Sequence, residues 1–109
     1  MADVLGAFEQ AVLLAIVRLG PEAYGRGIHA AVQERLERPV APGAVHATLD
    51  RLETKGLVRS WLGEGTKARD GWPRRYYTIE TAGIRALNDA RRTLQHVWSG
   101  FAWPMRVRG

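Results

Sequence analysis

The sequence of 109 residues has no cysteine and no long apolar run, and each absence removes a class of protein. Without cysteine the chain can form neither a disulfide framework nor a thiolate metal site, and a reducing cytoplasm is a compatible setting. The longest apolar stretch, 11–17, lies between Glu9 and Arg18 and is far shorter than the roughly 20 residues that cross a bilayer. No signal-peptide pattern precedes or follows it. We therefore expect one cytoplasmic domain with no membrane partner.

Acidic residues are in the minority, and catalytic groupings are missing. The 16 Lys and Arg against 11 Asp and Glu give a formal net charge of +5, which favours an anionic partner, either nucleic acid or a lipid surface. The three histidines, His29, His46 and His96, lie on different segments without metal-ligand spacing. No glycine-rich phosphate loop or Ser/His/Asp cluster accompanies them. The sequence therefore predicts no enzyme, no metal site and no cofactor.

The segment from Pro42 to Gly56 has the punctuation of one short helix. Proline suits the first helical position, and glycine suits the residue just past the end, where positive φ is favoured. At about 100° per residue, Val45, Leu49 and Leu52 form one narrow apolar stripe. The opposite side begins with small residues and carries groups able to bond base edges, so it is a candidate reader of a DNA major groove. Any surface helix has a polar face, so the neighbouring segments must decide.

Helical periodicity marks the segments that precede this one. Apolar spacings of three and four predict a helix from about Leu5 to Leu19, apolar over more than one face, which we expect a second chain to cover. Another helix is predicted from about Tyr24 to Arg38, and the chain then becomes extended because the residue before Pro39 is excluded from the α region. Two helices joined by a short turn, the second with a polar outer face, form a helix-turn-helix pattern.

Two β-rich segments follow, 57–62 and 75–79, and should pair as antiparallel strands. The polar loop between them is bounded by glycine and is too long for a tight hairpin. Its cations would lie along a phosphate backbone, although a merely solvated loop has the same composition. These cations are Lys67, Arg69 and Arg74, with Arg75 beside them.

The last helical segment opens near Thr81, the predicted N-cap, and continues past Trp98. Its apolar residues alternate spacings of three and four, which is typical of a helix that pairs along its length. Large apolar side chains from Phe101 to Met105 should then dock on a neighbour or form the lip of a pocket. Ordinary dimer packing and a flat ligand slot both explain the same set of residues. This set is Leu5, Phe8, Val12, Leu87, Leu94, Val97, Trp98, Phe101 and Trp103.

Over nearly its whole length the sequence resembles the PadR family of bacterial winged-helix transcriptional regulators. The resemblance is carried by Phe8-Glu9 with 12–15, by Ala23-Tyr24-Gly25, by Gly43-Ala44-Val45 with 48–49 and 51–58, and by 74–77 with Thr81-Ala82-Gly83. It implies a homodimer of the short subfamily, with a single last helix, that binds a pseudo-palindromic operator, usually as a repressor. It also implies release by a small aromatic or cationic ligand. His46 stands where the family usually has tyrosine, which changes the expected operator preference.

The predicted fold is mainly α with a small β-hairpin (α+β). A winged helix-turn-helix spans residues 1–80, and a dimerisation helix and tail span 81–109. The predicted function is sequence-specific binding of double-stranded DNA by a homodimer; a winged-helix module for protein contact, without operator recognition, is the alternative. The residues predicted to contact DNA are Tyr24, Gly43, His46, Ala47, Thr48, Arg51, Lys55, Lys67, Arg69, Arg74 and Arg75.

Overall fold

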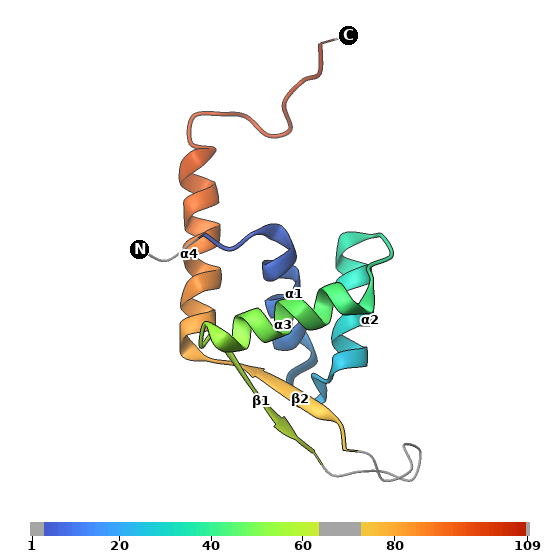
Figure 1. The fold of residues 1–109 in the computed structure, drawn as a ribbon. Helices are drawn as coiled ribbons and strands as arrows, with labels where there is room; N and C mark the ends of the chain where they lie inside the picture. Colours follow the sequence, from blue (N-terminus) through green and yellow to red (C-terminus); the bar gives the residue numbers. More distant parts are fainter. Residues whose placement is uncertain (1–3, 64–72, 109) are drawn as a thin grey trace.

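The computed structural model describes residues 4–63 and 73–108, and its elements follow the predicted order (Figure 1). Helix α1 (Ala7–Leu19) and a 3-10 turn, η1 (Gly20–Glu22), lead to α2 (Gly25–Leu36) and α3 (Pro42–Thr54). Strands β1 (Val58–Leu62) and β2 (Arg75–Ile79) form an antiparallel hairpin, and α4 (Thr81–Val97) follows. This arrangement confirms the α+β fold class. Of the predicted cations, Lys67 and Arg69 lie outside the described residues.

The ends of α3 follow the local chemistry that the sequence indicated, whereas α4 departs from the prediction at both ends. It ends at Val97, with Trp98 as its C-cap, and does not continue past Trp98. Proline begins α3, and Gly56 follows its end with φ 76°. The predicted N-cap of α4 was wrong: Glu80 takes that position, without a side-chain capping bond, and Thr81 is the first helical residue. The Glu80 amide donates to the Leu57 carbonyl at 2.9 Å, so the extended backbone of β2 ends at Glu80 and the helix starts one residue earlier than predicted.

The hairpin is joined by a short third segment that enters α2. Val58 pairs with Ile79, and Trp61 pairs with Tyr76. Tyr24 forms an isolated antiparallel bridge with Tyr76, and the Tyr77 amide donates to the Ala23 carbonyl at 2.8 Å. The hairpin is therefore bound to the start of α2.

The core lies where α1 meets α2, α3 and the sheet. Its largest fully buried side chains include Leu13 and Ile16 of α1, Ile28 of α2, and Leu49 and Leu52 of α3. The burial of these apolar groups, each contributing about 1.5–3 kcal/mol before the entropy cost of ordering, holds the three helices together.

Two residues predicted for the dimer interface belong to this core instead. Leu5 is 5% exposed and Val12 is fully buried. For Val12 the reason is that α1 is apolar around much of its circumference, and the chain's own α2, α3 and sheet cover the side that carries it; Leu5 lies just before the helix. Phe8 and Leu87 are partly buried against the same core. Leu14 and Val17, on another side of α1, remain about half exposed.

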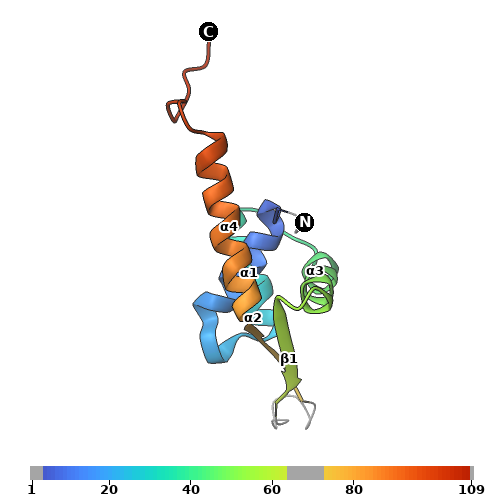
Figure 2. The ribbon, with the colours of Figure 1, turned by 90° about the vertical axis from the view of Figure 1, so that its left-hand side faces the viewer.

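The first half of α4 packs on the body of the molecule, and its second half projects away from it with the C-terminal segment (Figure 2). Gly83 permits the packing, because a Cβ there would lie 2.6 Å from Cγ1 of Ile79 and closer still to the Leu57 carbonyl oxygen. Within the described residues, no helix is long and apolar enough to span a membrane.

Candidate nucleic-acid interface

Helix α3 has one buried side and one outward side. Val45, Leu49 and Leu52 are buried as predicted, and the outward side carries Gly43, Ala47, Asp50 and Thr54, all exposed. We call these four residues the reading face.

Thr48, predicted to contact DNA, belongs to the buried side of α3. It is 2% exposed, because it stands one turn after Val45 and one turn before Leu52. Its Oγ1 accepts a hydrogen bond from Nη2 of Arg51 at 3.0 Å. The narrow stripe that the sequence suggested is therefore wider by one residue, and Thr48 is not available to a base edge.

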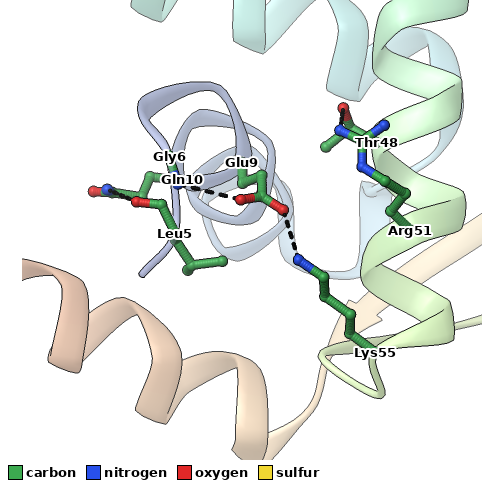
Figure 3. A network of polar contacts seen from close by, with 7 residues as sticks. All are labelled: Leu5, Gly6, Glu9, Gln10, Thr48, Arg51 and Lys55. Carbon is green, nitrogen blue, oxygen red and sulfur yellow. Dashed lines mark hydrogen bonds and ion pairs between the residues drawn. The ribbon is translucent and has the colours of Figure 1, made fainter. Parts of the chain in front are cut away.

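Arg51 and Lys55 lie on the side of α3 that faces the start of α1 (Figure 3). Lys55 Nζ donates to Oε2 of Glu9 at 3.2 Å, while Oε1 of Glu9 accepts the Gly6 amide at 3.2 Å. Burial raises the pKa of Glu9, but the Gly6 amide and the charges of Lys55 and Arg51 outweigh it, and the pKa lies below its ordinary value. Both of these predicted DNA-contacting cations therefore lie beside the reading face. Lys55 joins α3 to α1, while Arg51 bonds within α3.

His46 lies on the opposite flank, toward α2. A hollow of about 480 Å³ separates the first turns of α2 and α3 there. His46 is exposed at its wall, close to the first of the reading-face positions. The hollow is lined by Gly25, Arg26, His29, Pro42, Gly43, Val45, His46 and Leu49.

The turn into α3 is held by two side chains that sequence reasoning missed. His29 Nε2 lies 2.6 Å from the Val40 carbonyl oxygen, and because that oxygen only accepts, the ring must carry its proton on Nε2. Gln33 Oε1 accepts the Val40 amide at 2.9 Å. The two residues are four apart on one face of α2, and this spacing was the available signal. Together they fix both polar groups of one linker residue and so set where α3 begins.

The hairpin is tied to α3 through a chain of hydrogen bonds. Arg75 Nη1 donates to Oγ of Ser60 at 3.0 Å, and Ser60 donates to Oε2 of Glu53 through both its hydroxyl, at 2.7 Å, and its amide, at 3.1 Å. Glu53 belongs to α3, so Arg75 is held on the α3 side of the hairpin. On the same face, burial raises the pKa of Tyr77 above its ordinary value, against the lowering effect of Arg75.

Tyr24 and Arg74, both predicted phosphate contacts, lie together. The Arg74 guanidinium is 4.3 Å from the centre of the Tyr24 ring. That ring meets Tyr76 edge-on at 6.0 Å, and Tyr76 stacks on Trp61 at the same centroid distance. Cation–π attraction orients the guanidinium at the start of α2 without neutralising its charge.

An outward-facing α3, supported by α2 and followed by a cationic hairpin, defines a winged helix-turn-helix protein. The chain belongs to the PadR-like family of transcriptional regulators, which matches residues 13–89. It is therefore a DNA-binding transcriptional regulator and not an enzyme. No curated protein matches the sequence.

Solved structures agree with this assignment. A PadR family transcriptional regulator from Eggerthella lenta is 25% identical with a TM-score of 0.64, over 82% of this chain and 75% of that one. RosR from H. salinarum is 27% identical with a TM-score of 0.65, over 94% and 84% of the two chains. A PadR-like transcriptional regulator from Bacillus cereus, 22% identical over 84% of each chain, shares the fold with a TM-score of 0.68.

Proposed function

We propose that the chain works in the cytoplasm as a homodimeric repressor of a pseudo-palindromic operator. Residues 1–80 form the reading unit, and residues 81–109 join two copies. The observation that carries the proposal is the apolar side of α4 beyond the body of the molecule. Leu94 and Val97 are 58% and 66% exposed, and Trp98 follows them at 37%. A helix with such a stripe is stabilised by pairing along its length.

A groove beside the first half of α4 also supports pairing with a second copy of the chain. It has a volume of about 400 Å³ and a mainly apolar wall. Leu14 and Val17 of α1 reach it from one side, and Ile84 and Leu87 of α4 reach it from the other. The apolar surface therefore continues from the end of α4 down to α1, which gives a second copy an extended area to cover.

In this dimer the two α3 helices would enter successive major grooves, roughly 34 Å apart on one side of the duplex. Gly43, His46 and Ala47 would lie nearest the base edges. Tyr24, Lys67, Arg69, Arg74 and Arg75 would hold phosphates and fix the register.

The test is a gel-shift titration with duplex DNA from upstream of the protein's own coding region, against a shuffled duplex of equal composition. Operator binding predicts at least about 1,000-fold tighter binding to the first duplex. Equal affinity for both would favour the alternative, a winged-helix module for protein contact.

We propose further that a small planar aromatic ligand releases the operator. The residues that support it enclose a hollow of about 530 Å³ at the end of α4, where Trp98, Phe101 and Trp103 offer stacking surfaces. Arg91 also lines this hollow, and its charge disfavours the cationic ligand that the sequence left open. A ligand held between two α4 helices would change the angle between them and hence the separation of the two α3 helices.

Tryptophan fluorescence tests the ligand slot. Planar phenolic compounds should quench the emission of the dimer, and Trp98→Phe should weaken that quenching while sedimentation still shows a dimer. If no planar compound quenches the wild type, and Trp98→Ala alters only dimerisation, then these aromatic residues serve packing alone.

A further inference from the structure

The reading face of α3 carries one charged side chain, and it is acidic. The other charged groups of this segment have partners: Arg51 bonds Thr48, Glu53 bonds Ser60, and Lys55 bonds Glu9. Asp50 is exposed and makes no hydrogen bond or ion pair with any residue in 4–63 or 73–108. The one charged group on the surface that α3 would present to DNA is therefore a carboxylate.

The geometry of the helix brings that carboxylate close to whatever α3 faces. Gly43, Ala47, Asp50 and Thr54 are spaced four, three and four residues apart, which aligns them in one stripe opposite the buried side. The reading-face residues one and two turns before Asp50, which are Ala47 and Gly43, have no side chain beyond Cβ. The helix axis can therefore approach the floor of a groove, and a short side chain such as aspartate reaches a base edge.

The chemistry of a carboxylate restricts what it can accept there. It has no donor, and phosphates repel it. In the major groove the exocyclic amino groups of cytosine and adenine are the donors; guanine offers only acceptors, and thymine offers an acceptor and a methyl group. Adenine places its N7 acceptor beside the amino group, where it opposes a negative charge. Cytosine N4 is therefore the best match.

We propose that Asp50 is a specificity-determining residue that accepts a hydrogen bond from a cytosine amino group in each operator half-site. This inference rests on the proposed operator binding. In this proposal, α3 recognises a base by accepting a hydrogen bond from it. The reading face has no arginine or lysine that could donate hydrogen bonds to guanine. Repulsion between the same carboxylate and phosphates also weakens binding to unrelated sequences.

The experiment is selection of bound duplexes from a random DNA pool by the wild type, by Asp50→Ala and by Asp89→Asn. Asp89 is a matched control because it is an exposed carboxylate on α4, paired with Arg92 and remote from the reading face. A second measurement changes the selected cytosine to thymine in the operator and compares the affinities of wild type and Asp50→Ala by fluorescence anisotropy. Thermal unfolding of each variant checks that the fold is intact.

We expect the wild type and Asp89→Asn to select the same inverted repeat with one fixed cytosine per half-site, and Asp50→Ala to lose preference at that position alone. The cytosine-to-thymine change should weaken the wild type about tenfold per half-site and leave Asp50→Ala nearly unchanged. An inverted repeat that Asp50→Ala selects unchanged would overturn the role of Asp50 alone. A wild type that selects no sequence would overturn operator binding together with it.

Discussion

The carboxylate of Glu9 and the ammonium of Lys55 lie 3.2 Å apart although 46 residues separate them in the chain. Glu9 stands in the first turn of α1, and Lys55 is the C-cap of α3. The same carboxylate holds the Gly6 amide, so one side chain closes the start of α1 and fastens it to the end of α3. This contact fixes the position of α3 relative to α1. In the proposed dimer, α1 lies beside the interface.

Replacing Glu9 by glutamine should lower the free energy of unfolding by about 1 kcal/mol at pH 7. The native pKa of Glu9 lies below its ordinary value of 4.5, so its contribution is present above that pH and is lost as the pH falls through the native pKa. Urea unfolding at pH 7 and pH 3 measures this: the difference between wild type and Glu9→Gln should shrink in acid. Glu34→Gln, on the exposed side of α2, should show no such difference at either pH.

Gly83→Ala should destabilise the fold by about 1–3 kcal/mol, because the new methyl group meets the Leu57 carbonyl and Ile79 where α4 leaves the sheet. Thermal unfolding measures the loss. Gly43→Ala is the matched control. Apart from its chain neighbours and its own helix backbone, no atom of residues 4–63 and 73–108 lies within 4 Å of the added Cβ, and alanine favours a helix by up to about 1 kcal/mol. An unchanged melting temperature in Gly83→Ala would show that α4 sits elsewhere.

Arg75→Gln should reduce the salt dependence of operator binding. About six phosphates neutralised by the dimer give a slope of log K against log salt near −5, and loss of one contact in each protomer should make the slope shallower by about two. Titrations over a range of salt concentrations measure the slope. Arg92→Gln removes another exposed cation, paired with Asp89 on α4, and should leave the slope unchanged. Equal slopes for all three proteins would remove Arg75 from the interface.

Leu94→Asp should separate the two copies, since it places a charge in the exposed apolar stripe of α4. Sedimentation at micromolar concentration should then show monomers, and operator affinity should fall by about 100-fold or more because two linked reading heads become independent. His96→Asp is the control, on the opposite side of the same half of the helix. A Leu94→Asp protein that stays dimeric would place the interface elsewhere.

Local patterns in the sequence were sufficient for the element order and for most of the core. Proline before and glycine after α3 marked its limits, and the stripe through Val45, Leu49 and Leu52 identified its buried side. Thr48 was assigned to the wrong side of α3. Its spacing places it with the buried residues, but a polar side chain is expected to face outward when burial is judged by residue type. Its hydroxyl is satisfied by Arg51, a partner within the same helix.

Contacts between distant segments account for the rest. The core position of Val12 depends on which part of a broadly apolar α1 the other helices cover, and no periodicity in α1 alone decides that. The bonds from His29 and Gln33 to Val40, and from Lys55 to Glu9, join segments whose approach is set by the tertiary fold.

Sedimentation equilibrium of the purified protein measures whether α4 joins two copies into one DNA-reading unit, as proposed. At micromolar concentration we predict the mass of two 12.1 kDa chains. The complex with one operator duplex should also contain two chains. A stable 12.1 kDa monomer at that concentration would contradict the account.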